Sequence, residues 1–271
     1  MSLTGKVVVV TGSTRGIGRA IAQTCAAHGA TVVVSSRSAG AVESAVVEMT
    51  ARNAAVSGFV ADVAHFEEVE ALKAHAIATH GRIDVWFNNA GVSNGYRPMD
   101  EESDRELHDL ITINLLGHMY GAKAMIPYFR EHGGHLMNMC GRGWKGEGTP
   151  YTTAYAASKA AIASLTRSLA EENKDAKNVS INAFVPGMVD TDFYVDIKSS
   201  PRLESTKGNI RLALDAFGTP VAEVAERAVS LIAEDPGRQT GKVFPMLSPG
   251  KLIRGGAMMA WWGMTGRLKR A

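Results

Sequence analysis

Tyr155 and Lys159 are the two residues of this sequence whose types and spacing best suit acid–base chemistry. On a helix, residues four apart share a face, so the phenol and the ammonium can act on one site. A free tyrosine has a pKa of about 10, too high for easy proton exchange at neutral pH, and a neighbouring cation lowers it. A tyrosine and a lysine at this spacing also occur by chance in many helices, so the pair needs support from other motifs.

A glycine-spaced turn follows the first hydrophobic stretch, in Lys6–Gly18, KVVVVTGSTRGIG. Four consecutive valines without polar alternation predict a strand buried on both faces, as in a parallel sheet. Gly12, Gly16 and Gly18 fall where a dinucleotide site needs residues without a Cβ. The helix that follows directs its positive end and its free N–H groups at phosphates. The stretch therefore predicts a bound dinucleotide.

Two arginines lie where such a site distinguishes its nucleotides. Ser35-Ser36-Arg37 follows the second predicted strand, and Arg15 lies inside the glycine turn. An acidic residue at the end of the second strand favours the ribose of NAD, whereas an arginine there favours the 2′-phosphate of NADP. Two guanidinium groups and no carboxylate favour NADP(H). The alternative is that Arg37 is a solvated surface charge.

The next two strands also end in candidate binding residues. Asp62-Val63 could contact an adenine, or the aspartate could cap the following helix. Asn88-Asn89-Ala90-Gly91 combines small residues, along which a cofactor can lie, with amides that can brace neighbouring strands. Taken alone, a turn explains this second motif equally well.

Strands and helices alternate along most of the chain, which predicts one α/β domain with a parallel sheet and helices on both faces. In open sheets of this kind, ligands bind beyond the carboxyl ends of the strands, where the motifs above lie. The predicted strands are 6–10, 31–35, 56–60, 83–87, 135–139, 179–184 and 242–246. Besides the helix after the glycine turn, the predicted helices are 39–52, 66–80, 100–131, 151–173 and 221–234.

Taken together, the motifs resemble those of the short-chain dehydrogenases/reductases, and the resemblance spans residues 1–247. The motifs that carry it, in order, are Thr11–Gly18, Asn88–Gly91, Asn114, Tyr155 with Lys159, and Pro186–Thr191. It implies a Rossmann-type, doubly wound, seven-stranded parallel sheet. It also implies a homodimer or homotetramer assembled through the long helices around residues 101–131 and 151–173.

The resemblance also assigns roles. It implies that Tyr155 is the general acid/base, that Lys159 lowers its pKa and holds the nicotinamide ribose, and that Asn114 positions a proton-relay water. The cofactor contacts it implies, together with those read from the strand ends, are Gly12, Thr14, Arg15, Gly16, Ile17, Gly18, Arg37, Asp62, Val63, Asn88, Ala90, Gly91, Tyr155, Lys159, Pro186, Gly187, Val189 and Thr191.

One position departs from the family pattern, which has a serine at the end of the fifth strand. Alignment on Asn138 places Gly141 there, and counting back thirteen residues from Tyr155 places Arg142 there. Loss of one hydrogen-bond donor to a reacting oxygen typically costs about a hundred- to a thousandfold in rate. We therefore expect a replacement donor: a backbone N–H of the loop, the Cys140 thiol, or a hydroxyl. The candidate hydroxyls are those of Thr149, Thr152 and Thr153.

The loop 141–150 is the predicted substrate contact. Arg142 and Lys145 could pair with a carboxylate or phosphate, and Trp144 could cover a ring, with Gly141 beside the reacting oxygen. The alternative is that these side chains point to solvent. Residues 191–217 are the expected substrate lid, and their apolar face favours a hydrophobic substrate.

Residues 248–271 form a C-terminal extension that is apolar and then basic. It could fold over the protein, reach a neighbouring subunit, or rest on a membrane surface, and we favour packing on the protein itself. The net charge of +2 in 271 residues gives no reason to expect nucleic acid. No run of residues is apolar enough for stable membrane insertion. The eight histidines suggest no metal site.

The sequence thus predicts a cytoplasmic enzyme, with Cys25 and Cys140 reduced and Cys25 in the core. The expected reaction is NADP(H)-dependent hydride transfer between a ketone or aldehyde and an alcohol on a hydrophobic or ring-containing small molecule. One alternative is a non-redox, epimerase-type member of the family. Another is an NADP-binding regulatory protein with impaired catalysis.

Overall fold

Seven parallel strands form one sheet at the centre of the computed structural model, which describes residues 2–191, 199–206 and 208–268. Their order is β3-β2-β1-β4-β5-β6-β7, so the direction of winding reverses between β1 and β4. The single α/β domain and the Rossmann-type sheet are as predicted. The strands are β1 Val7–Thr11, β2 Thr31–Ser36, β3 Val56–Val60, β4 Val85–Asn88, β5 Gly134–Met139, β6 Val179–Val185 and β7 Val243–Pro245.

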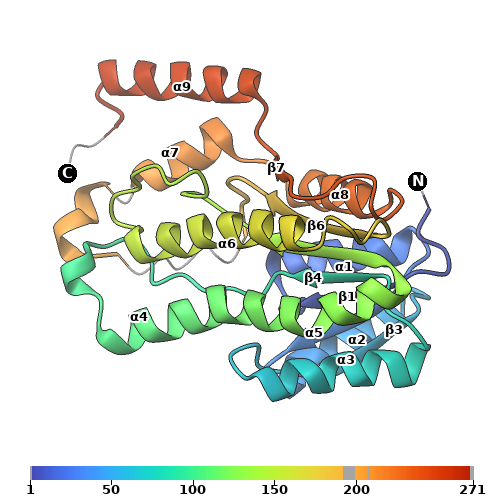
Figure 1. Ribbon diagram of the computed structural model, residues 1–271. Coiled ribbons are helices and arrows are strands. Elements are labelled where there is room, and N and C mark those ends of the chain that lie inside the picture. The colour runs from blue at the N-terminus through green and yellow to red at the C-terminus, as the bar shows by residue number, and fades with distance from the viewer. Residues whose placement is uncertain (1, 192–198, 207, 269–271) are drawn as a thin grey trace.

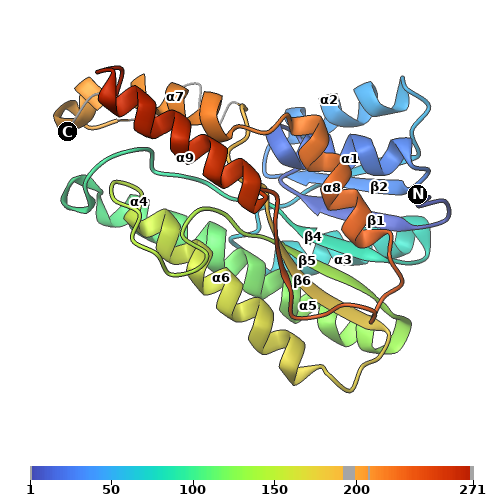
Figure 2. The same ribbon diagram turned by 90° about the horizontal axis from the view of Figure 1, so that it is seen from above.

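Helices cover both faces of the sheet (Figures 1 and 2). One face carries α1 Gly16–Ala27, α2 Ala39–Thr50 and α8 Val221–Ile232. The other carries α3 Phe66–His80, α5 Gly117–His132 and α6 Thr153–Glu172. α4 Asp104–Ile111 precedes α5, and α7 Gly208–Phe217 and α9 Pro249–Met264 lie beyond the sheet.

The valine run of β1 explains why its strand lacks polar alternation. Successive side chains of a strand point to opposite faces. Val8 and Val10 belong to the core under α1, α2 and α8, and Val7 and Val9 belong to the core under α3 and α5. Both sets are buried, so a hydrophobic residue is favoured at every position.

The predicted helix over residues 100–131 is divided in the structure. A short 3-10 helix Met99–Glu101 comes first, and α4 then begins at Ser103 with a capping box to Glu106. A π-helical turn, Thr112–Leu116, joins α4 to α5. Such turns often lie at functional sites, and this one contains Asn114.

Two helices were not predicted from the sequence, α7 in the expected lid and α9 in the extension. Residues 192–198 of the lid lie outside the described residues. α9 continues through its internal glycines, because Ser248 caps its first turn and its inner face packs on α7. The extension therefore packs on the protein with one of its faces, as favoured from the sequence (Figure 1).

None of the described helices combines the length and the apolar run that crossing a bilayer requires.

Candidate active site

Tyr155 and Lys159 lie one turn apart on α6, at the carboxyl end of β5. The Lys159 Nζ donates a hydrogen bond to the main-chain oxygen of Met139, at 3.0 Å, and lies 5.4 Å from the centroid of the Tyr155 ring. Lys159 is only 2% exposed, and this burial lowers its pKa to about 8. The structure therefore brings the two residues to one site, as their spacing predicted.

Asn114 fixes the segment after β4 beside this lysine. Its side chain accepts from the Val92 N–H at 2.8 Å and donates to the Val92 oxygen at 2.9 Å, with a longer bond to the Ser158 hydroxyl. A Cβ at Gly91 would lie 3.2 Å from the Asn114 Oδ1 and 3.8 Å from the Lys159 Nζ. The tight contact is the one with the Asn114 Oδ1, so a larger residue at position 91 would press on the Asn114 side chain, whereas the distance to Lys159 is an ordinary contact.

His118 is a neighbour of Lys159 that the sequence analysis did not single out. The imidazole is 1% exposed, and its Nε2 has no hydrogen-bond partner among the described residues. Burial first, and then the Lys159 charge, lowers the pKa of His118 to about 3. A neutral imidazole therefore adjoins the lysine at physiological pH. The signal that could have found it is the spacing in the sequence, because His118 follows Asn114 by four residues, about one helical turn.

Gly141, not Arg142, faces the acid–base pair. A Cβ at position 141 would lie 2.6 Å from the Tyr155 hydroxyl and 3.3 Å from the Lys159 Cγ. The Tyr155 hydroxyl thus occupies space that any larger residue at 141 would require. The Arg142 side chain is exposed.

The candidate replacement donors differ in how they are engaged. The Cys140 thiol is buried and points to the Lys159 main-chain oxygen, and burial raises its pKa to about 11. The Thr152 hydroxyl donates to the Thr149 oxygen, and Thr153 is exposed. The Thr149 hydroxyl is buried and has no hydrogen-bond partner among the described residues. Of these groups, Thr149 alone combines burial with an unused hydroxyl.

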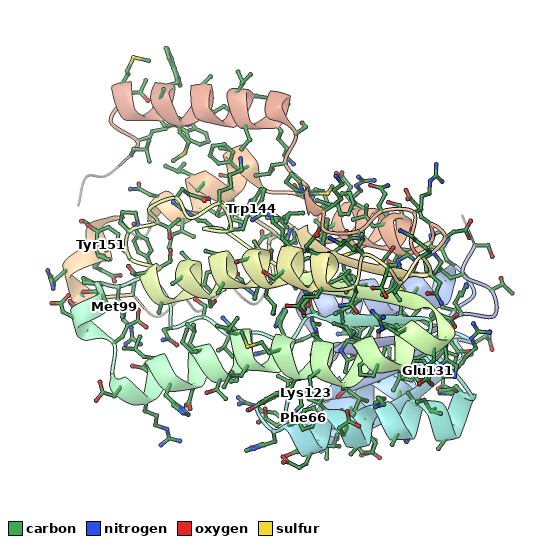
Figure 3. The ribbon with its side chains drawn as sticks, viewed as in Figure 1. Phe66, Met99, Lys123, Glu131, Trp144 and Tyr151 are labelled. Carbon is green, nitrogen blue, oxygen red and sulfur yellow. The ribbon has the colours of Figure 1, made fainter. Side chains whose placement is uncertain are left out.

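The rest of the 141–150 loop is held by its own contacts. The Glu147 carboxylate accepts from the N–H groups of Gly143 and Lys145. Trp144, labelled in Figure 3, packs on the cluster that contains Cys140 and Ile162. The Lys145 and Arg167 charges lie 5.3 and 6.0 Å from the centre of its ring. The Trp144 ring is therefore partly covered by the protein itself. The Lys145 side chain, like that of Arg142, is exposed.

The glycine turn after β1 is an open anion cradle. Gly16 has a φ of +56°, which favours glycine, and a Cβ there would meet nothing within 4 Å. A Cβ at Gly18 would collide with the Asn89 side chain and the Gly12 oxygen. α1 begins without a side-chain cap and without an acidic residue in its first turn. The first N–H groups of the helix therefore remain available, so the turn fits a dinucleotide pyrophosphate.

The two segments that carry Arg15 and Arg37 are hydrogen-bonded to each other through Ser13 and Ser35. The Ser13 N–H donates to the Ser35 oxygen at 3.0 Å, and the Ser35 N–H donates to the Ser13 hydroxyl at 2.9 Å. Arg15 and Arg37, each two residues further on, are exposed, and within the described part of the chain neither forms an ion pair. Two uncommitted cations therefore follow two segments that are hydrogen-bonded to each other.

Other predicted cofactor residues contribute main chain more than side chain. The Asn88 amide accepts from the Trp86 indole and donates to Asn138 and the His118 oxygen, so it braces β4, β5 and α5. A Cβ at Gly12 would lie 2.8 Å from the Ala90 Cα, so β1 and the segment after β4 touch there. Thr14 and Ile17 are partly buried in the glycine turn, and Ile17 packs on the core.

Asp62 and Val63 are both engaged within the protein. The Asp62 carboxylate accepts from the Ala64 N–H, at 3.0 Å, and the N-terminal cap of α3 is His65. Asp62 therefore closes a turn and does not cap the helix. Val63 is buried, and a Cβ at Gly117 would collide with it.

The segment after β6 continues the same edge of the sheet. Pro186 and Val189 are buried, and Gly187 and Thr191 are partly buried. Val189 belongs to the core, and its oxygen accepts from the Thr191 hydroxyl. The Met188 oxygen also accepts from the Thr219 N–H, so this segment is held by contacts within the protein.

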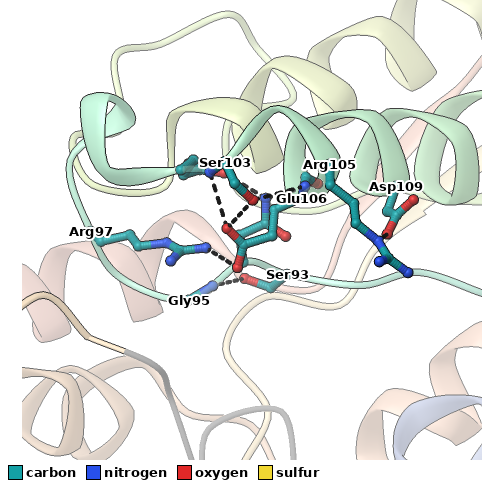
Figure 4. A network of polar contacts seen from close by, with 9 residues as sticks. Ser93, Gly95, Arg97, Ser103, Arg105, Glu106 and Asp109 are labelled. Carbon is teal, nitrogen blue, oxygen red and sulfur yellow. Dashed lines mark hydrogen bonds and ion pairs between the residues drawn. The ribbon is translucent and has the colours of Figure 1, made fainter.

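The segment 92–98 forms the outer part of the site and is fixed to α4 (Figure 4). Arg97 forms an ion pair with Glu106 at 2.6 Å, and this contact, with the Ser103 bonds, lowers the pKa of Glu106 to about 2. The main-chain N–H of Arg97 donates to the main-chain oxygen of Tyr151, and this bond ties the segment to the 141–151 loop. The segment is therefore held to α4 by the ion pair and to the 141–151 loop by the main-chain bond.

Two aromatic side chains at this outer part were missed by the sequence analysis. The rings of Tyr96 and Tyr151 meet edge to face, with centroids 5.1 Å apart. Tyr96 also pairs with Ser199 of the lid segment, and the Ser200 N–H donates to its oxygen. Tyr151 has a φ of +66°, which no local sequence signal announces. The loops after β4 and β5 and the lid thus meet at Tyr96.

Comparison with known proteins identifies the class. The family model described as short chain dehydrogenase matches residues 6–201, and the chain belongs to this family. Chlorophyll(ide) b reductase NOL of Oryza sativa subsp. japonica is 37% identical over 243 residues, which cover 87% of this chain and 68% of that protein. The 3beta-hydroxysteroid dehydrogenase 1 of Eggerthella lenta is 34% identical over 249 residues, 88% of this chain and 91% of that one.

A solved structure agrees with these sequence relatives. Levodione reductase is 28% identical, with a TM-score of 0.80 over 95% of this chain and 99% of that chain. The protein is therefore an oxidoreductase of the short-chain dehydrogenase/reductase family that acts on CH–OH and C=O groups. A nicotinamide cofactor is typical of the family.

Proposed function

We propose that the protein is an NADP(H)-dependent oxidoreductase that interconverts a ketone or aldehyde and an alcohol on a hydrophobic or ring-containing small molecule. The observation that carries the proposal is the contact between the Tyr155 hydroxyl and Gly141, next to the buried Lys159. A phenol held there, beside an ammonium whose pKa is lowered, is placed for proton exchange at a substrate oxygen.

The residues divide the work as follows. In the reductive direction, Tyr155 gives its proton to the carbonyl oxygen, and the Lys159 ammonium stabilises the phenolate that remains. Asn114 holds the Val92 main chain beside this pair. The bound nicotinamide supplies or accepts the hydride. Taking Gly141 as the family's serine position, we assign the missing donor to the Thr149 hydroxyl, which is buried and unused.

The glycine turn and the two arginines hold the nucleotide in this proposal. The N–H groups at the start of α1 receive the pyrophosphate, and Arg15 and Arg37 receive the 2′-phosphate. The absence of an ion pair at either guanidinium, among the described residues, supports this assignment. Asp62, Ala90, Gly91, Gly187, Val189 and Thr191 complete the contacts, mainly through main-chain groups.

The substrate class is argued from the outer part of the site. Tyr96 and Tyr151 present two aromatic rings where three loops meet, and such rings suit a substrate with apolar or ring area. Trp144 and Arg142 remain proposed contacts at the other side of the 141–150 loop. The steroid and chlorophyll(ide) relatives support a ring-containing substrate.

We also propose a homodimer or homotetramer in a reducing compartment, the cytoplasm. A groove between α5 and α6 supports the assembly, since most of its lining residues are apolar, among them Met119, Ile126, Leu165 and Leu169. Cys25 and Cys140 are both buried free thiols, which fits the compartment.

The test is NADPH oxidation with a panel of cyclic hydrophobic ketones, for the wild type and for Tyr155→Phe. Removing the general acid should reduce kcat/KM by about 10²- to 10⁴-fold, whereas NADPH affinity should stay within a few-fold. Tyr120→Phe is the matched control and should retain activity, since it removes the hydroxyl of a phenol on α5 whose ring packs against Phe66 of α3. Undiminished turnover by Tyr155→Phe would contradict the proposal.

A further inference from the structure

α9 presents two different faces. Its inner face packs on α7 and on the residues that follow α7: a Cβ at Gly255 would collide with the Phe217 ring, and the Lys251 Nζ donates to the Thr219 hydroxyl at 2.8 Å. Met258, Met259 and Trp262 are partly covered on the same side. The helix is therefore anchored to the protein by contacts that use only half of its circumference.

The outer face of α9 is an exposed apolar stripe. Ile253 is 74% exposed, Trp261 62% and Met264 76%. With Ala257 and Ala260, which are also exposed, they recur at intervals of three and four residues and so share one face. Figure 3 draws side chains on the side of α9 that is turned away from α7.

Charge is distributed unevenly around this stripe. The described residues 248–268 contain Lys251, Arg254 and Arg267 and no acidic residue, and the printed sequence continues with Lys269 and Arg270. These five cations leave residues 1–247 with a net charge of −3, against +2 for the whole chain. One helical step of about 100° places Arg254 at the edge of the stripe, next to Trp261. The net positive charge of the protein therefore comes from its apolar extension.

A second copy of the chain suits this surface poorly. A helix of this length is roughly 24 Å long and about 10 Å across, so its outer face covers on the order of 240 Å². A stable dimer buries about 800 Å² on each partner. Two copies paired through the stripe would also bring cations together with no acidic residue on either helix.

We propose that the outer face of α9 is a docking surface for anionic phospholipid bilayers. The stripe Ile253–Met264 enters the boundary between headgroups and acyl chains, with Trp261 in the interfacial layer where indole rings concentrate. Arg254 lies at the edge of the stripe and Arg267 follows its C-terminal end, and in the proposal their long side chains reach lipid phosphates while their stems cover apolar surface. The helix lies on the bilayer and does not cross it.

Docking would bring the bilayer to the substrate side of the enzyme. α9 packs on α7, the helix of the expected lid, and Figure 1 shows both on the same side of α6, the helix that carries Tyr155. The docking surface is independent of the proposed reaction, because it uses no residue of the acid–base pair or of the nucleotide turn. Vesicle binding without cofactor or substrate therefore tests it separately.

The experiment is co-sedimentation of the full chain with phosphatidylcholine vesicles, with and without phosphatidylglycerol. We expect the wild type to bind the anionic vesicles at least about tenfold better than the neutral ones, and binding to fall as salt rises. Trp261→Ser with Met264→Ser should weaken binding about tenfold or more, since both side chains are exposed and their loss leaves the packing on α7 intact. Val47→Ser, at an equally exposed valine on α2, is the control and should bind like the wild type.

A second pair of variants separates charge from apolar contact. Arg254→Gln with Arg267→Gln should reduce binding to anionic vesicles and leave the weak binding to neutral vesicles unchanged. Light scattering after gel filtration should give the same mass for the wild type and for the Trp261→Ser, Met264→Ser variant. Absent binding to anionic vesicles, equal binding by that variant, or its conversion to a smaller oligomer would each overturn the proposal.

Discussion

The nucleotide half of the molecule and the substrate half are built in different ways. In the nucleotide half, β1, β2 and β4 are tied by Ser13 with Ser35 and by Asn89 with the Thr11 and Gly12 oxygens. In the substrate half, Thr149 has an unused buried hydroxyl, Tyr151 has a positive φ, and α9 exposes an apolar stripe. In the nucleotide half these polar groups are hydrogen-bonded to each other and fix the main chain, whereas the substrate half presents an unpaired hydroxyl and exposed apolar side chains.

The difference shows where specificity is encoded. A dinucleotide is the same molecule in every enzyme that uses it, so fixed main-chain positions can hold it. Substrates differ, and they are met by loops on a rigid scaffold. If this reading is correct, changes in the substrate half should alter turnover while nucleotide binding persists, and changes in the nucleotide half should do the reverse.

The largest effect should come from Gly141→Ala. The added Cβ would lie 2.6 Å from the Tyr155 hydroxyl and displace it, so we expect kcat/KM to fall by about a thousandfold. NADPH affinity should change little. For the same reason Gly141→Ser should not improve the enzyme, although it introduces a hydroxyl. Gly148→Ala, in the same loop with nothing within 4 Å of its Cβ, is the control, and an active Gly141→Ala enzyme would refute this account of the contact.

Lys159 should reveal itself in the pH dependence of stability. Burial lowers its pKa from 10.5 to about 8, so between these values the unfolded chain binds more protons than the folded one. This group therefore makes the free energy of unfolding rise with pH across that window, by on the order of 3 kcal/mol in total. Urea unfolding from pH 7 to 10.5 should show that rise for the wild type and its absence in Lys159→Met. The exposed Lys242→Met should follow the wild type, and a Lys159→Met curve parallel to it would exclude the buried charge.

Thr149→Val tests the proposed donor. Valine keeps the shape of threonine and removes the hydroxyl, so we expect kcat to fall by about a hundredfold. Thr153→Val alters an exposed hydroxyl at the start of α6 and should be nearly neutral. Equal activities for the two variants would move the donor role to the main chain of the loop.

The smallest effect should be a change of nucleotide preference. Arg37→Gln should lower the preference for NADPH over NADH by about tenfold, because the proposed charge-assisted contact with the 2′-phosphate is lost. Turnover at saturating nucleotide should be unaffected. Arg227→Gln, on α8, should leave the preference unchanged, and an Arg37→Gln enzyme with unaltered preference would remove the argument for NADP(H).

Much of the nucleotide half could be predicted from sequence because its signals are local. The valine run of β1 predicts a strand buried on both faces, and the glycines just after it predict the turn. The sheet and the pairing of Tyr155 with Lys159 on one helix face followed from the same periodicities. The strands β3 and β5 were located within one residue.

The remainder depended on contacts between distant segments. The π-helical turn at Asn114 interrupts a hydrophobic pattern that reads as one helix. The unsatisfied imidazole of His118 is apparent only once α5 lies beside Lys159. α9 contains four glycines that argue against a helix, yet Gly255 is what allows close packing on Phe217. Propensity alone could not anticipate that tertiary contact.

The central claim is direct hydride transfer assisted by the Tyr155 phenol, and isotope transfer tests it most directly. The protein is given NADPH in which both hydrogens of the reactive ring carbon are deuterium, together with the panel of cyclic ketones, and the alcohols are analysed by mass spectrometry. The account predicts one deuterium on the carbinol carbon for each NADPH consumed, and formation of this product at least about a hundredfold slower with Tyr155→Phe. Conversion without deuterium in the product, or tight NADPH binding with no conversion of any ketone, would contradict it.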